Sequence, residues 1–127
     1  MRADRLLLDT HAFIWWRENN PRLGADARSA ITGAAVVYVS IATAWEAAIK
    51  TSLGKLKLPA SVETGVVESG FERLPVTFGH AEAVARLPFH HRDPFDRMLV
   101  AQCLTERLSL VTRDRRMGAY GIEVVWT

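Results

Sequence analysis

The sequence predicts an α/β fold in which one parallel sheet lies between two layers of helices. Short apolar or β-branched runs alternate with helical patterns along the chain, an order that is typical of strands joined by right-handed helical crossovers. The 127 residues are enough for one domain, residues 1–127, which buries roughly two-thirds of the surface of its unfolded chain. No internal repeat or low-complexity linker divides the sequence.

The first third of the chain predicts two strands and two helices. Residues 5–9, RLLLD, form a nearly continuous apolar run, as expected for a strand covered on both faces. A helix should follow through Arg17, and the segment NNPRLG at residues 19–24 breaks it. The pattern of residues 26–34 favours a second short helix, and VVYVS at residues 36–40 has the β-branched and aromatic composition of a strand.

The middle of the chain predicts two more helices and a peripheral strand. Residues 43–54, TAWEAAIKTSLG, have a helical pattern, and either Ser40 or Thr43 could cap the helix at its start. Residues 61–70 favour a further helix, which two glycines weaken. Residues 71–76, FERLPV, are a short strand or edge segment, because the proline in this run argues against a central strand.

The last third predicts two helices and two strands. A helix is expected at residues 79–87, followed by the loop PFHHRDP at residues 88–94. The clearest helix covers residues 93–108, with an aspartate at the N-cap, a proline at the first helical position and an apolar stripe. The apolar runs at residues 108–112 and 122–126 are strands that complete the sheet.

Four carboxylates fall at positions that a parallel sheet brings together. Asp9 is the last residue of the first strand, and Asp114 follows the fourth strand. Glu46 lies within about two turns of the start of the helix after VVYVS, and Asp96 lies in the first turn of the helix that begins DPFD. Since ligands of open α/β sheets bind outside the carboxyl ends of the strands, we expect these four side chains to converge on one edge.

Each carboxylate also has a purely structural explanation. Asp9 could cap the helix that follows it, Asp96 could stabilise the positive end of its helix, and Asp114 could serve in a turn. Glu46 could be a solvated helix residue, although its neighbours in AWEAAI are apolar, and Asp93 suits a plain N-cap. Capping does not require the side chains to meet, so their joint placement favours a shared site.

The predicted carboxylate cluster indicates a hard divalent cation. Carboxylates in one pocket repel one another unless a cation compensates their charge. With no cysteine or histidine set beside them, oxygen ligands indicate Mg²⁺, or alternatively Mn²⁺, rather than zinc. The reaction suited to such a site is phosphodiester hydrolysis, in which the cation activates water and neutralises charge on the scissile phosphate.

Composition and charge exclude several other classes of protein. The net charge of +2 gives no global argument for nucleic-acid binding. The single cysteine, Cys103, cannot form an internal disulfide, and its apolar surroundings predict burial. No apolar stretch approaches the ~20 residues of a membrane span, and the apolar run at the amino terminus is too short for a secretory signal. We therefore expect a cytoplasmic protein without a membrane partner.

The chain resembles PIN-domain ribonucleases of the VapC toxin type in four segments, which follow the order and spacing of that family. These segments are LLLDTHAFIWW, SIATAWEAAIKTSLGKLKLP, DPFDRMLVAQC and LVTRD. The resemblance implies a three-layer α/β/α PIN-like domain with a five-stranded parallel sheet. It places the acidic quartet of the family on Asp9, Glu46, Asp96 and Asp114.

The resemblance also implies roles and partners. Asp9 and Asp96 would most directly hold Mg²⁺, and Asp114 would complete the metal shell. Glu46 would bind the metal, through water, or position the nucleophile. The implied activity is metal-dependent endoribonuclease, in a homodimeric toxin that a VapB-like antitoxin inhibits by inserting a segment into the active-site groove.

Basic residues beside the acids suggest how RNA would be held. The cluster comprises Arg92, Arg97, Arg113, Arg115 and Arg116. Substrate contact, above all by Arg97, Arg113 and Arg115, is favoured over a solvated, charge-balancing face. Thr112 could donate its hydroxyl to the metal shell or substrate, or could simply end a strand.

Other polar and aromatic residues have two interpretations on the sequence alone. Lys50, Lys55 and Lys57 could extend the basic border, and the loop histidines His90 and His91 could touch RNA or reflect loop polarity. Two of the three tryptophans Trp15, Trp16 and Trp45 suit packing in the core or at a subunit interface better than stacking on bases.

Two other functional classes compete with a nuclease. A phosphoryl-transfer domain also carries an aspartate after its first strand, but such domains need a second acid nearby, where DTHAF has threonine and histidine. A non-catalytic binding module would keep the fold without needing four acids. Metal-dependent RNA cleavage that is lost in Asp9→Asn and Asp96→Asn proteins would exclude both.

Overall fold

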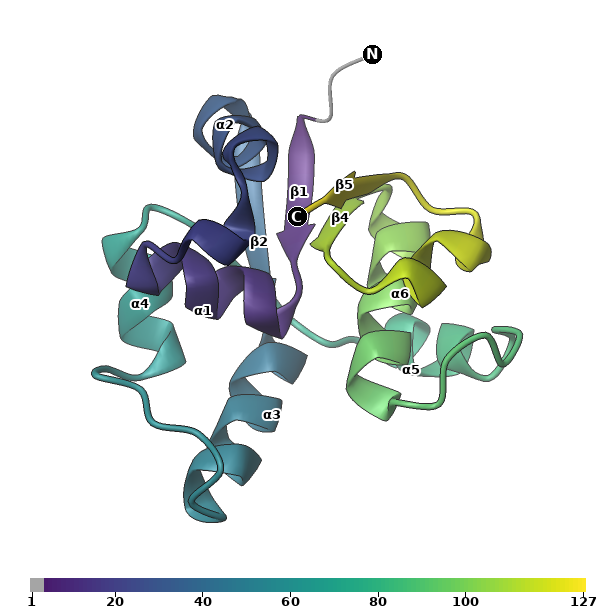
Figure 1. Cartoon of the computed structure of the whole chain (residues 1–127). Helices are drawn as coiled ribbons and strands as arrows, with labels where there is room; N and C mark the ends of the chain where they lie inside the picture. The colour runs from purple at the N-terminus through teal and green to yellow at the C-terminus, as the bar shows by residue number, and fades with distance from the viewer. Residues whose placement is uncertain (1–3) are drawn as a thin grey trace.

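The computed structural model describes residues 4–127 and contains one five-stranded, all-parallel sheet (Figure 1). The strands lie in the order β3-β2-β1-β4-β5. Their bounds are β1 Arg5–Leu8, β2 Val36–Ser40, β3 Glu72–Leu74, β4 Ser109–Thr112 and β5 Val124–Trp126. The predicted three-layer α/β/α architecture is confirmed, and the run that contains Pro75 forms the edge strand β3, as its proline indicated.

Helices connect the strands and cover both faces of the sheet. The α-helices are α1 Thr10–Glu18, α2 Ala25–Gly33, α3 Ile41–Ser52, α4 Val62–Glu68, α5 Phe78–Val84 and α6 Pro94–Glu106. Two 3-10 helices, η1 Pro21–Leu23 and η2 Arg115–Tyr120, lie in segments for which no element was expected. Among residues 4–127, no helix is both long and apolar enough to cross a membrane.

The alternation of side chains along β1 divides the core into two halves. Leu6 and Leu8 pack with α1, α2, α4 and part of α3, whereas Leu7 packs with α6, η2 and part of α5 on the opposite face (Figure 1). All three leucines are fully buried. Because successive side chains of a strand point to opposite faces, this short apolar run supplies both cores, as expected for a central strand of a parallel sheet.

Capping residues set where the two helices nearest the acids begin. The Ser40 hydroxyl accepts a hydrogen bond from the amide of Ala42, so α3 starts directly after β2. The Asp93 carboxylate accepts from the amides of Phe95 and Asp96, which confirms its predicted role as the N-cap of α6. The side chains of α6 are therefore fixed relative to the edge of the sheet.

The strand order creates a crevice at the carboxyl ends of β1 and β4. From β1 the chain passes to β2 and β3 on one side, and then crosses to β4 and β5 on the other. The connections that leave β1 and β4 therefore run toward opposite edges of the sheet. Open α/β sheets bind ligands at such a point, outside the carboxyl ends of the strands. Asp9 follows β1 at this point, and Thr112 ends β4.

The close approach of α4 to α1 explains the glycine that weakened the helix prediction for residues 61–70. A Cβ atom at Gly65 would lie 2.9 Å from Cζ of Phe13 and 3.0 Å from Nε of Arg17. We expect Gly65→Ala to lower the free energy of unfolding by about 1–3 kcal/mol, because the core ring must shift. Gly79→Ala in α5, where the nearest atom is 3.7 Å away, should instead raise it by about 0.5 kcal/mol. Urea titration of both variants measures the difference, and equal effects would contradict the packing explanation.

Candidate active site

Asp9 serves both as a helix cap and as the centre of the polar site. Its Oδ1 accepts from the amide of Ala12 at 2.8 Å, and its Oδ2 accepts from the hydroxyl of Thr112 at 2.6 Å. The residue is only 7 % exposed, and this burial raises the pKa of its carboxyl. The two explanations that the sequence left open for Asp9 are therefore not exclusive.

Thr112 is not positioned to contact RNA, contrary to one of its two sequence-based interpretations. The residue is fully buried, its hydroxyl donates to Asp9, and its oxygen accepts the amide of Asp114 at 3.1 Å. A hydroxyl with these partners cannot also reach a substrate. Thr112 instead orients Asp9 and ties the end of β4 to the end of β1.

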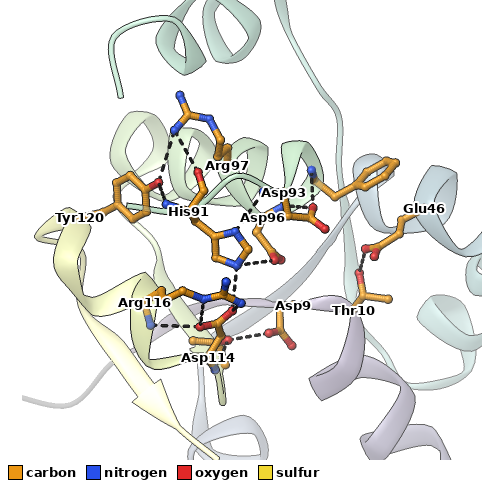
Figure 2. Close-up of polar contacts among 12 residues, drawn as sticks. Asp9, Thr10, Glu46, His91, Asp93, Asp96, Arg97, Asp114, Arg116 and Tyr120 are labelled. Carbon is orange, nitrogen blue, oxygen red and sulfur yellow. Dashed lines mark hydrogen bonds and ion pairs between the residues drawn. The ribbon is translucent and has the colours of Figure 1, made fainter. Parts of the chain in front are cut away.

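Asp96, like Asp9, is a carboxylate whose ionised form is disfavoured at this site. Its side chain is 27 % exposed and points from the first turn of α6 toward Asp9 and Asp114 (Figure 2). Burial, followed by the neighbouring charge of Asp93, raises its pKa to about 7, and the charges of Asp9 and Glu46 act in the same direction. Such a carboxyl is predisposed to accept a cation.

His91 brings a side chain into the site that the sequence did not assign to it. Its Nε2 lies 2.8 Å from Oδ2 of Asp114 and 3.1 Å from Oδ2 of Asp96, and the residue is 6 % exposed. The expectation that no histidine lies beside the acids is therefore wrong. The three side chains form a group whose potential ligand atoms all lie within 4.8 Å of one another.

The hydrogen bonds of His91 fix which ring nitrogen carries the proton. Its Nδ1 accepts from the amide of Asp93 at 3.0 Å, so the proton resides on Nε2 and is shared between Asp96 and Asp114. In this arrangement His91 has no free lone pair for a metal and acts as a positioning residue for the two carboxylates. Its amide donates to the hydroxyl of Tyr120 at 2.9 Å, which holds the loop in place.

Asp114 has an additional partner in Arg116. The guanidinium donates to Oδ1 at 3.0 Å through Nε and to Oδ2 at 2.8 Å through Nη2. This contact, with the hydrogen bond from His91, holds the pKa of the Asp114 carboxyl well below its usual range. Arg116 is exposed, so a cation at the site can displace it at little cost.

Glu46 approaches the other acids from α3 and is held by two donors. Its Oε1 accepts from the hydroxyl of Thr10 at 2.6 Å, and its Oε2 pairs with Nζ of Lys50 at 2.7 Å. The residue is 6 % exposed, so it is not the solvated helix residue of the alternative interpretation. Its charge raises the pKa of both Asp9 and Asp96.

A cavity of about 450 Å³, which we call the acidic cavity, opens at this edge of the sheet. Its lining residues come from three connections and are Asp9, His11, Trp15, His91, Asp93, Asp96, Arg113, Asp114 and Arg116. Figure 2 shows Asp96 and Asp114 meeting at His91, with Asp9 close by and Glu46 held by Thr10. Three predicted metal-binding carboxylates thus line one cavity, and the fourth acid adjoins it.

The predicted arginine cluster separates into different environments. Arg113 lines the acidic cavity, and Arg115 lies over the ring of Trp126 at 4.4 Å. Arg97 is 6 % exposed, and its guanidinium donates to the carbonyls of Val84 and Pro88 at 3.1 and 2.9 Å. The expectation that Arg97 binds RNA is therefore wrong, because its donors are used inside the fold.

The donor set of the acidic cavity fits a hard divalent cation. Asp9, Asp96 and Asp114 offer carboxylate oxygens, and burial together with the charge of Asp93 raises the pKa of Asp96. Mg²⁺ and Mn²⁺ prefer oxygen ligands of this kind. His91 keeps its proton on Nε2, so it adds orientation rather than the nitrogen ligand that would favour zinc.

Comparisons with known proteins agree on the fold. The family model described as PIN domain matches residues 6–123 of the chain, while no curated protein sequence matches it significantly. Two similar solved structures are VapBC2 from Rickettsia felis bound to a promoter DNA fragment (TM-score 0.68, 12% identity, 94% of this chain and 96% of that chain) and DNA-bound VapBC from Salmonella typhimurium (TM-score 0.65, 21% identity, 98% of each chain). FitAcB from Neisseria gonorrhoeae has a TM-score of 0.64 at 18% identity, covering 96% of each chain. At these identities the structures establish a shared fold.

Proposed function

The chain belongs to the PIN domain family, and on that premise we propose that it is a Mg²⁺- or Mn²⁺-dependent endoribonuclease, the VapC-type toxin of a toxin–antitoxin pair. The observation that carries this proposal is that Asp9, Asp96 and Asp114, from three separate connections, line one cavity. Helix capping alone would not gather them there.

The side chains of this chain divide the work at the site. Asp9, Asp96 and Asp114 would hold the cation, which when bound activates water and neutralises charge on the scissile phosphate. Thr112 and His91 orient these carboxylates through the hydrogen bonds that they donate. Glu46 lies just outside and contributes its negative charge to the same region.

RNA cleavage by the purified chain tests the proposal. We expect an end-labelled single-stranded RNA to be cut internally when Mg²⁺ or Mn²⁺ is present, leaving a 5′-phosphate and a 3′-hydroxyl. A chelator should stop the reaction, and readdition of the cation should restore it. Single-stranded DNA of the same sequence is the matched control, which tests whether cleavage requires the ribose of RNA. Cleavage that continues undiminished in chelator would refute the metal-dependent mechanism.

The raised pKa of Asp96 predicts how the cation affects stability at different pH values. The folded protein retains the Asp96 proton up to about pH 7, whereas the unfolded chain loses it near 3.8, so this carboxyl lowers the free energy of unfolding as pH rises through that window. A cation bound to Asp96 would take the place of this proton, so the proton competes with the cation at low pH and no longer does so above about pH 7. We therefore expect Mg²⁺ to raise the unfolding temperature more at about pH 8 than at about pH 5.

Circular dichroism melts with and without Mg²⁺ measure this difference. The Asp96→Asn protein is the control, since it has no proton to exchange at this position and should show little dependence on Mg²⁺ at either pH. A stabilisation by Mg²⁺ that is equal at both pH values, or that persists in Asp96→Asn, would contradict the assignment of Asp96 as a ligand.

The partner and assembly of the chain are also part of the proposal. The neighbouring structures named above include VapBC proteins, which supports a VapB-like antitoxin as the partner of this chain. We place the surface of the proposed homodimer at an apolar groove of about 440 Å³, lined among others by Ile41, Trp45 and Phe95. Trp45 is 63 % exposed there, an unusual exposure for a tryptophan outside an interface.

A further inference from the structure

A second cavity, of about 430 Å³, adjoins the acidic cavity and lies between α1 and α3. We call it the α1–α3 cleft. His11 and Trp15 line both cavities, so the cleft and the acidic cavity share a wall. The charged residues that line the cleft alone are Glu18, Arg22, Lys50 and Lys55.

We propose that the α1–α3 cleft binds single-stranded RNA next to the scissile bond, with Trp15 stacking on a base and Arg22 and Lys55 contacting phosphates. This inference rests on the proposed endoribonuclease function and names the residues that hold the substrate beyond the acids. On the sequence alone, base stacking was one of two interpretations of Trp15, and Arg22 was not assigned to RNA.

The charge of the lining changes sign between the two cavities. Four aspartates face two arginines in the acidic cavity, whereas in the cleft three cationic side chains face only the carboxylate of Glu18. Lys50 is paired with Glu46 at 2.7 Å. Within residues 4–127, the exposed side chains of Arg22 and Lys55 form no ion pair. Free cations beside a cluster of acids suit phosphates that flank a metal-bound scissile group.

Trp15 has the position of a preformed stacking surface. The indole is half-buried and packs partly against the core, which holds it in place. The guanidinium of Arg113 lies over its ring at 5.7 Å from the centroid, and the ring of His11 lies 5.7 Å away at a tilt of 38°. Because Arg113 is exposed, a base can take its place over the indole while the guanidinium turns to a phosphate.

The combination of groups in the cleft matches a single strand of RNA better than a peptide. Each nucleotide of a single strand presents a negatively charged phosphate and an unstacked, flat base. The cleft offers unpaired cations and an aromatic ring within one cavity. A peptide segment of a partner protein does not present alternating phosphates and bases, so it would not require both cations and an aromatic ring.

Direct RNA binding to a cleavage-deficient protein tests the proposal. The Asp96→Asn protein is titrated, in buffer containing Mg²⁺, against a labelled single-stranded RNA of about ten nucleotides, and binding is followed by fluorescence anisotropy. Adding Trp15→Leu, which keeps an apolar side chain against the core, should weaken binding about tenfold. Adding Lys55→Ala should reduce the slope of log affinity against log salt concentration by about 0.7.

Matched controls come from an exposed aromatic residue and an exposed cationic residue outside both cavities. Phe78→Leu removes an exposed aromatic ring, and Arg86→Ala removes an exposed cationic side chain; neither residue lines the acidic cavity or the cleft. Both controls should bind RNA with the affinity and salt slope of the Asp96→Asn parent. Because Lys55 is exposed, we expect Lys55→Ala to fold normally. Its salt slope therefore tests the cleft assignment even if the Trp15→Leu protein does not fold.

The outcomes separate this inference from the proposed function. If the Asp96→Asn parent does not bind RNA at all, the endoribonuclease proposal and the cleft assignment fail together. If the parent binds RNA, and Trp15→Leu and Lys55→Ala bind it as the two controls do, only the cleft assignment is overturned. The cleft would then be the better candidate for a peptide segment of the partner protein.

Discussion

Replacing Asp96 by asparagine should reduce RNA cleavage about 100-fold or more while the protein remains folded. The carboxylate lies in the first turn of α6, where burial and the charge of Asp93 raise its pKa to about 7. A bound cation would compensate this charge, and an amide of the same shape binds such a cation far less well. The substitution therefore removes a proposed ligand without removing the contact that Oδ2 makes with His91.

Stability separates the loss of a ligand from the loss of the fold. Because the ionised Asp96 is disfavoured in the folded protein, Asp96→Asn should unfold in chelator at a temperature equal to or above that of the wild type. The matched control is Asp26→Asn, which replaces an exposed acid in the first turn of α2 and should cleave RNA normally. Full cleavage by Asp96→Asn would rule out the proposed mechanism.

Replacing Arg97 by alanine should lower the free energy of unfolding by about 3 kcal/mol. The guanidinium donates to the carbonyls of Val84, Leu87 and Pro88 at the end of α5 and beyond it, and these carbonyls would lose their charged partner inside the protein. Arg97→Lys should also destabilise strongly, because one ammonium cannot reproduce a planar fork of donors. Urea unfolding monitored by circular dichroism gives the difference.

Another arginine of the same predicted cluster, Arg92, provides the control for Arg97. Arg92 is exposed, so Arg92→Ala should change the free energy of unfolding by less than about 0.5 kcal/mol. If Arg97→Ala were as stable as Arg92→Ala and instead lost only RNA affinity, the original assignment of Arg97 to the substrate would be reinstated.

The sequence predicted those features that depend on local pattern. The apolar run at residues 5–9 and the VVYVS run identified central strands, and the DPFD segment identified the start of α6 with its cap. The convergence of Asp9, Asp96 and Asp114 followed from one topological rule about parallel sheets. Each of these inferences uses neighbours in the sequence or the order of elements, which are visible without coordinates.

The errors concern contacts between segments far apart in the chain. His91 meets Asp114 across 23 residues, and Thr112 meets Asp9 across 103. Nothing local distinguishes a buried loop histidine from an exposed one, and an arginine beside an acid is typical of a phosphate-binding surface. Arg97 is instead buried because α5 ends against α6, where its guanidinium donates to the carbonyls of Val84 and Pro88.

The central claim is that acids from separate connections hold one hard divalent ion at the edge of the sheet. Anomalous diffraction from crystals soaked in Mn²⁺ tests it most directly. We predict a single strong peak about 2 Å from carboxylate oxygens of Asp9, Asp96 or Asp114, shared by at least two of them and lost in crystals of Asp96→Asn. A peak bound elsewhere, or one that survives this substitution unchanged, would contradict the account.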